Sequence, residues 1–369
     1  MFLSMNLRII LLGAIWAALA CNVHAAVWTV SNNPNSPGQF TNLQTAIDAA
    51  GFYDTVMVAG SATSYGSISF GKPLVLIGAG YHNPFGNNTT VDNITLLRQN
   101  ISVSANGSKI MGFIISSYVT LNGTFTGGVD STRTINNIAM ERCQFNIFRF
   151  GSNAINTFKN DTIRNCLITG YIQLYSYNHK FQNIHLHNNL FSSASASGSI
   201  YLAGASSSII SDLTSCYLRN NLFLNHITNC FSFIKNLVIE NNIFYGAEPF
   251  GGTTCVLNKN LTYMCINNSI PGTGNSGAGN LVNIDPQFIN FPVAGGAYSY
   301  SYNVKLKPSS AGRNAGSDGT DIGIYGGLKP YEVGANPCFP QMMEISFPSG
   351  SSAPVGGTLD VFFKAIKQN

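Results

Sequence analysis

The sequence contains few charged residues. Of its 369 residues, 19 are Lys or Arg and 15 are Asp or Glu, so 9% are charged, against about 25% in an ordinary soluble domain. A coiled coil would need far more Glu, Lys and Ala, and a charge-rich disordered chain would lack the 24 Phe and 16 Tyr present here. The net charge is only +4, with two short basic pairings, so the footprint of a nucleic-acid-binding protein is also missing.

The cysteine pattern excludes a structural zinc site. No CxxC pair and no Cys/His cluster at zinc spacing occurs among the eight cysteines. Seven of them follow Cys21, an odd number that leaves at least one thiol unpaired, and the sequence does not define a disulfide pairing.

The first 25 residues have the pattern of a secretory signal peptide. Arg8 supplies a positive charge, residues 9–20 are apolar, and small residues precede Ala26. The apolar run is shorter than the roughly 20 residues that a membrane helix needs. We therefore expect a mature chain without a membrane span, secreted or on the cell surface. A retained anchor and lipid attachment at Cys21 are the alternatives.

An internal repeat fills the middle of the chain. Each copy has an alternating run, a polar pair and an apolar anchor, and the copies are 137–145, 161–168, 184–191, 216–223, 237–244 and 263–270. The anchors recur at intervals of 21 to 32 residues, which is typical of a solenoid. Stacked strands about 4.8 Å apart would bury the apolar face of each coil. Asparagine at the coil corners suits left-handed backbone, and its amide can pair with neighbouring coils. The alternative is a β-sandwich with accidental similarity.

Both ends of the repeat have the pattern of caps. Residues 40–51 predict an amphipathic helix that starts near Thr41 and stops at Gly51, followed by strands at 54–58 and 73–78. After about Tyr331 the repeat is lost, proline becomes frequent, and a strand-like run covers 358–365. We therefore expect a signal peptide over 1–25, followed by an all-β fold. This fold is a single-stranded parallel β-helix solenoid over 26–330, with an N-terminal capping helix, and a small C-terminal β tail over 331–369.

Several of these segments resemble a known family. The helix with the strands at 54–60 and 72–80 resembles the start of pectate-lyase-like right-handed β-helix proteins. Residues 284–288, 302–310, 314–316 and 321–327 are similar to secreted bacterial β-helix proteins with a choice-of-anchor C-terminal region. The resemblance implies a right-handed β-helix and export. It does not imply one activity, because this fold carries lyases, hydrolases and adhesins.

The repeat also predicts which polar side chains are neighbours. One outward column contains Glu141, Arg164, His187, Arg219 and Glu240, and the adjacent column contains Ala139, Thr162, His185, Tyr217 and Val238. In a structural interpretation, Glu141 pairs with Arg164 and Arg219 with Glu240 to keep an exposed face soluble. In a functional interpretation, the column binds an acidic polysaccharide.

The functional interpretation assigns a role to each candidate. Arg164, His187 and Arg219 would donate to the glycan, Tyr217 would offer a ring for stacking, and the ligand-binding set is Glu141, Arg164, His185, Tyr217 and Glu240. A glycoside hydrolase is excluded for the acidic pair of this column, because its two carboxyls must lie about 5–9.5 Å apart. Glu141 and Glu240 stand four coils apart, roughly 19 Å at about 4.8 Å per coil.

A polysaccharide lyase needs a cation to neutralise a uronate carboxylate and a base for the neighbouring proton. Arg219 and His187 are the catalytic candidates. The acidic cluster that the family resemblance implies for Ca²⁺ is missing from these coils, so no cofactor is expected unless the chain is a calcium-dependent lyase. Asp318 and Asp321 are the nearest approach to a metal loop, although a turn explains them more simply. The favoured hypothesis is a non-catalytic protein that binds polysaccharide or another surface component, and the alternative is a uronate-specific lyase acting by β-elimination.

Overall fold

The computed structural model describes residues 25–83, 86–98, 103–122, 134–151, 157–174, 179–192, 200–201, 210–224, 229–292, 298–334, 341–346 and 362–366. The predicted signal peptide, apart from its last residue, and Cys338 lie outside these ranges. Cys143, Cys166, Cys216, Cys230, Cys255 and Cys265 are described, and all six are free and buried.

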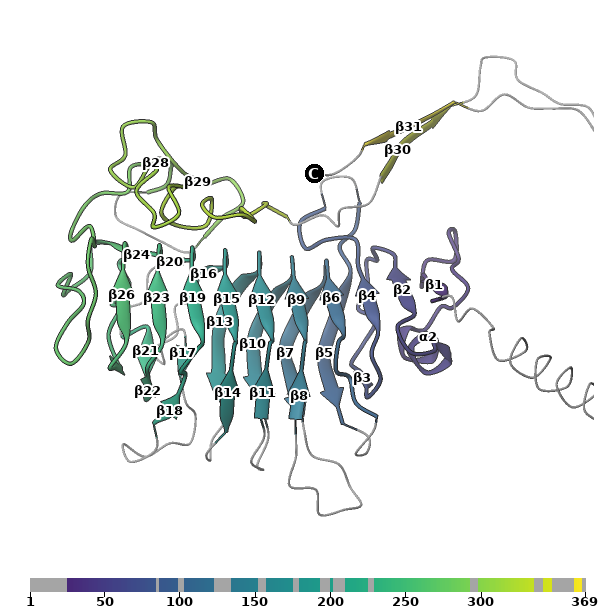
Figure 1. Cartoon of the computed structure of the whole chain (residues 1–369). Coiled ribbons are helices and arrows are strands. Elements are labelled where there is room, and N and C mark those ends of the chain that lie inside the picture. Colours follow the sequence, from purple (N-terminus) through teal and green to yellow (C-terminus); the bar gives the residue numbers. More distant parts are fainter. Residues whose placement is uncertain are drawn as a thin grey trace, which may run out of the picture.

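Parallel strands stack along one axis and form the coils of a β-helix (Figure 1). The first sheet contains, in spatial order, β1 (Val27–Val30), β2 (Thr55–Val58), β4 (Val75–Ile77), β6 (Lys109–Met111), β9 (Ala139–Glu141), β12 (Thr162–Arg164), β15 (His185–His187), β19 (Tyr217–Arg219), β23 (Val238–Glu240) and β26 (Val256–Asn258). The second sheet contains β3 (Ile68–Phe70), β5 (Thr90–Leu97), β7 (Ile114–Asn122), β10 (Gln144–Phe150), β13 (Leu167–Leu174), β16 (Leu190–Ser192), β20 (Leu222–Leu224), β24 (Ile243–Tyr245) and β27 (Leu261–Tyr263). In the same sheet, β17 (Ile200–Tyr201) pairs with β13, and β21 (Phe231–Ser232) pairs with β17.

Two short sheets form the third side of the coils. They are β8 (Thr134–Asn136), β11 (Thr157–Lys159) and β14 (Lys180–Gln182), and then β18 (Ser211–Asp212), β22 (Ile234–Lys235) and β25 (Gly252–Thr253). Every strand pair in the sheets of the coils is parallel and joins neighbouring coils, as between β9 and β12 or β12 and β15. The protein is therefore an all-β parallel β-helix, as the repeat predicts.

The predicted anchors fill the interior of the coils. Phe145, Ile168, Phe191, Phe223 and Phe244 have no exposed surface. The ring of Phe223 stacks on Phe191 at 4.4 Å and on Phe244 at 4.8 Å between centroids. Stacking in register lets each coil bury the apolar face of the one before it, which no coil could do alone.

The sixth predicted copy, 263–270, is wrong. The coil after β24 is instead formed by β26 and β27, so Thr262 lies beside Phe244 in the anchor column. Asn267 and Asn268, which imitate the corner pair, form a turn in which the Asn268 side chain accepts from the Cys265 N–H and donates to its carbonyl. The true sixth copy has Lys259 and Asn260 at its corner. Because only one of the two corner residues is asparagine, the repeat pattern does not identify this copy.

The two asparagines of each corner pair have different tasks. The first, at Asn188, Asn220 and Asn241, adopts positive φ angles of 55°, 52° and 57°. The second, at Asn189, Asn221, Asn242 and Asn260, is fully buried. These buried amides bond from one coil to the next, for example from Asn189 Nδ2 to Asn221 Oδ1 at 3.1 Å. The expected left-handed corners and amide ladder are therefore both present, but on neighbouring residues.

A short helix covers the first coil. Helix α2 (Leu43–Ala49) buries Leu43, Ala46 and Ile47, and its N-cap is Asn42 rather than Thr41, because the Asn42 side chain accepts the Thr45 N–H. Within the described ranges, no helix is long and apolar enough to cross a membrane.

The chain after the last coil returns along the outside of the β-helix. Strands β28 (Phe288–Asn290) and β29 (Asn303–Leu306) pair antiparallel and cover outward apolar residues of the second sheet. These are Leu167, Leu190, Leu222, Ile243 and Leu261. Residues 312–334, here called the C-terminal strap, then follow the corner between the first two sheets back toward β4 (Figure 1). Strands β30 (Gln341–Ser346) and β31 (Phe362–Ile366) form an antiparallel hairpin in the region of the expected β tail.

Candidate functional site

The two outward columns that the repeat predicts are present on the first sheet. Glu141 lies beside Arg164, Arg164 beside His187, His187 beside Arg219 and Arg219 beside Glu240. The residue before each of them, such as Met140 or Ile163, is buried. Because side chains alternate along a strand, the five ionisable groups all face outward.

Glu141 is held between two cations. Its carboxylate lies 2.8 Å from Arg164 Nη2 and 3.2 Å from Lys109 Nζ. Burial raises the pKa of Glu141, but Arg164 and Lys109 outweigh this effect and the pKa lies below its usual value. Glu141 is therefore ionised at neutral pH and orients Arg164. Lys109 is missing from the predicted site, although its strand resembles a degenerate copy of the repeat.

The other end of the column combines an ion pair with packed rings. Arg219 Nε lies 2.9 Å from Glu240 Oε2, without the alignment of a hydrogen bond. The Arg219 guanidinium carbon sits 4.3 Å from the centre of the Tyr217 ring, and His185 stacks on the same ring at 5.1 Å. Since two side chains already pack on Tyr217, its ring face is not free for a sugar in the way the sequence suggested.

His187 stands at the centre of the column and contacts the corner beside it. Its Nδ1 lies 3.0 Å from Asn188 Oδ1. Burial lowers the pKa of His187, and Arg164 and His185 lower it further, against opposing contributions from Asn188 and Glu141. The imidazole is therefore neutral at pH 7. Asn188 is a functional candidate that the sequence reasoning treated only as a corner residue.

His185, on the same strand, belongs to a chain of amides at the other corner. Its Nε2 lies 2.7 Å from Asn183 Oδ1, Asn183 Nδ2 donates to Asn160 Oδ1, and Asn160 Nδ2 donates to Asn137 Oδ1. Burial and the charge of Arg219 lower the pKa of His185. This second column therefore places a neutral histidine beside the charged column.

The acidic residues do not fit a metal site. In the ranges that the structure covers, no three His, Cys, Asp or Glu side chains gather in a way that could hold an ion. Asp318 accepts the Thr320 N–H and hydroxyl, and Asp321 pairs with Arg313 at 3.2 Å, so both stabilise a turn of the strap. Glu141 and Glu240 are four strands apart in the first sheet, which agrees with the exclusion of a hydrolase pair.

A buried acid inside the coils is a further residue that the sequence reasoning missed. Asp161 is 1% exposed and occupies the inward corner position held by Ile138 and Ile184 in adjoining coils. Its Oδ1 accepts the Ile138 N–H at 2.8 Å, while no residue in the described ranges bonds to Oδ2. Burial raises its pKa well above the usual value. Aligning the inward position of each copy would have revealed it.

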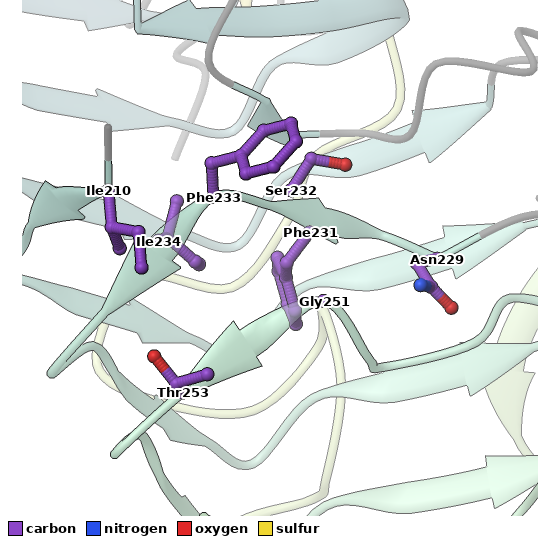
Figure 2. A pocket seen from close by; sticks show the side chains of 8 residues that line it. All are labelled: Ile210, Asn229, Phe231, Ser232, Phe233, Ile234, Gly251 and Thr253. Carbon is purple, nitrogen blue, oxygen red and sulfur yellow. The ribbon is translucent and has the colours of Figure 1, made fainter. Parts of the chain in front are cut away.

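An open hollow of about 250 Å³ lies between β21, β22 and β25 (Figure 2). It is lined by uncharged side chains, among them Ile210, Phe233 and Thr253. Phe233 has a φ of 55°, whereas the neighbouring coil has Gly251 in the corresponding place. The hollow contains none of the predicted site residues.

Comparison with known proteins adds little beyond the fold. No protein-family model and no curated protein matches the sequence. Among solved structures, the chain is similar to an alginate lyase from Paenibacillus sp. str. FPU-7, with 16% identity, a TM-score of 0.41, and coverage of 65% of this chain and 91% of that one. It is also similar to an arginine-to-alanine variant of the PL6 family alginate lyase AlyGC, with 14% identity, a TM-score of 0.29, and coverage of 83% and 60%. At such low identities and TM-scores, these similarities add nothing to what the parallel sheets of the chain already show about its fold.

Proposed function

We propose that this protein is exported and binds an acidic polysaccharide along the outward face of the first sheet. Arg164, His187 and Arg219 would make the direct contacts from three consecutive coils. The observation that supports this proposal is their register: β12, β15 and β19 place the three side chains side by side and partly exposed. A glycan lying along the solenoid axis would meet one of them at each coil.

The arginines are pre-ordered for such a ligand. Glu141 holds Arg164, and Glu240 and Tyr217 hold Arg219. Side chains that are already ordered lose less entropy when a ligand binds. The Arg219 side chain is 42% exposed, and its ion pair uses Nε, so the two terminal nitrogens can face a carboxylate as a fork.

Binding can be tested by calorimetry with the mature chain and a panel of uronate polysaccharides that includes alginate. The Arg164→Ala/Arg219→Ala variant removes two charged hydrogen-bond donors worth about 1.5–3 kcal/mol each. We expect Kd to rise roughly a hundredfold or more.

The matched control is Lys235→Ala/Arg313→Ala. It also removes two positive charges, which pair with Asp212 and Asp321 outside the column. Unchanged affinity in the column variant, or an equal loss in the control, would show that the column is not the binding site.

A second candidate function is a lyase, favoured by the neutral state of His187 beside two arginines. His187 would take the proton on the carbon next to a uronate carboxylate, and Arg219 would neutralise that carboxylate. The C–H electron pair would form a C=C bond while the glycosidic C–O bond breaks, and the leaving oxygen would take a proton from water. The unsaturated product absorbs in the ultraviolet. Absorbance that grows with the native chain and not with His187→Ala would support the lyase, and its absence with every polyuronate would exclude it.

A further inference from the structure

Two histidines on one strand are held in opposite ways. We infer that Asn188, locked by the C-terminal strap, keeps the proton of His187 on Nδ1 and so leaves the Nε2 lone pair to accept a hydrogen bond from a glycan hydroxyl. The position of the proton on His187 follows from contacts within the protein and does not depend on any ligand. The role of the lone pair rests on the proposed function.

The orientation of the Asn188 amide follows from its partners. One side-chain atom lies 2.9 Å from the Ile324 carbonyl oxygen and 2.8 Å from the Gly326 carbonyl oxygen. A carbonyl oxygen only accepts, so that atom must be the amide nitrogen, and Oδ1 must face His187. Asn188 is 2% exposed, so these two carbonyls, and not solvent, determine the orientation of its amide.

The state of His187 then follows. Asn188 Oδ1 can only accept, so the Nδ1 that lies 3.0 Å away must carry the hydrogen. A neutral imidazole carries one N–H. Burial lowers the pKa of His187, and Arg164 and His185 lower it further, so the ring is neutral despite the opposing effects of Asn188 and Glu141. No described residue bonds to Nε2, so its lone pair remains for a ligand.

His185 has the opposite arrangement. Asn183 Nδ2 donates to Asn160 Oδ1, so Asn183 Oδ1 faces His185 Nε2 at 2.7 Å. The hydrogen of His185 is therefore on Nε2. One strand thus carries both tautomers, and each is set by an asparagine that is itself held by a third group.

The central column then has a defined order of hydrogen-bonding groups. Arg164 donates, His187 accepts and Arg219 donates, one per coil. A polyuronate matches this order, because it has carboxylates that accept and hydroxyls that donate. A glycan without free hydroxyls would leave the His187 lone pair without a partner.

The tautomers can be read directly by long-range ¹H–¹⁵N correlation spectra of the full ¹⁵N-labelled chain. Only six histidines are present, and single His→Gln variants assign them. We expect a protonated Nδ1 for His187 and a protonated Nε2 for His185. A protonated Nε2 on His187 in the native chain would overturn the inference.

Asn188→Gly tests the cause, because glycine tolerates the positive φ at this position. The matched control is Asn220→Gly, which lies one coil along, has a φ of 52° and also contacts the strap, at the Asp321 and Gly323 carbonyls, but has no histidine beside it. We expect His187 to become a mixture of tautomers in Asn188→Gly and to stay unchanged in Asn220→Gly. No change in the first variant, or equal changes in both, would refute the role of Asn188.

Glycan affinity is a separate readout. Loss of one neutral hydrogen bond should weaken polyuronate binding by about two- to tenfold in Asn188→Gly, with no change in Asn220→Gly. If the native chain binds no polyuronate, the proposed function fails while the tautomer assignment is still decided by the spectra. If it binds and Asn188→Gly binds equally well, the lone pair has no role in recognition.

Discussion

The buried asparagine ladder should contribute a large part of the stability of the coils, and Asn221→Ala is its sharpest test. Asn221 is fully buried. Its Oδ1 accepts from Asn189 N and Nδ2 at 2.9 and 3.1 Å, and its Nδ2 contacts the Leu186 and Arg219 carbonyls and Asn242 Oδ1 at 3.0, 2.9 and 2.9 Å. Alanine would remove all of these side-chain contacts from the protein interior.

The size of the effect follows from this set of bonds. Two accepted bonds and the two amide hydrogens make about four hydrogen bonds, each with a net value of about 0.5–1.5 kcal/mol. We therefore expect Asn221→Ala to lower the free energy of unfolding by roughly 2–6 kcal/mol. Asn221 does not have a positive φ, unlike Asn220, so the substitution tests the amide and not the backbone.

Guanidinium unfolding followed by far-ultraviolet circular dichroism measures this loss. The control is Asn160→Gly, in the half-exposed amide chain with Asn137 and Asn183. Its φ is 57°, which glycine accepts, and a surface change of this kind should cost less than about 1 kcal/mol. If Asn221→Ala costs no more than Asn160→Gly, the ladder does not contribute the stability expected from its hydrogen bonds.

Two further predictions concern stability. Burial raises the pKa of Asp161, so the folded state keeps a proton that the unfolded chain releases. The contribution of this proton to the free energy of unfolding is complete below the unfolded pKa of about 3.9. It falls as pH rises, by up to about 1.4 kcal/mol per pH unit. Asp161→Asn should remove this pH dependence. If the free energy of unfolding changes with pH in the same way in the native chain and the variant, the prediction is wrong. A Cβ at Gly251, where φ is 98°, would lie 1.6 Å from the Phe231 carbonyl oxygen; Gly251→Ala should therefore cost about 2 kcal/mol or more, and an unchanged Tm would show that the corner adapts.

Much of the candidate site could be predicted because neighbouring coils are in register. Once the copies are aligned, Arg164 must lie between Glu141 and His187, and both expected ion pairs of the column are present. The alignment failed at 263–270, where a local turn imitates the corner pair. The outward columns do not contain Asp161, which lies at an inward position of its coil.

The sequence by itself determined the parallel β-helix, five of the six predicted interior anchors and the order of side chains along the outward columns. These features depend on contacts between adjacent copies, which the repeat encodes in residue type and spacing. Only the tertiary structure decided that the C-terminal strap lies on the corner and that Asn188 faces His187. Those contacts join residues 136 and 138 positions apart through backbone carbonyls. Because every residue has such a carbonyl, no residue type in the strap signals the contact. The scarcity of charge therefore has a counterpart in the structure: asparagine amides, and not ion pairs, form most of the polar ladders that join the coils.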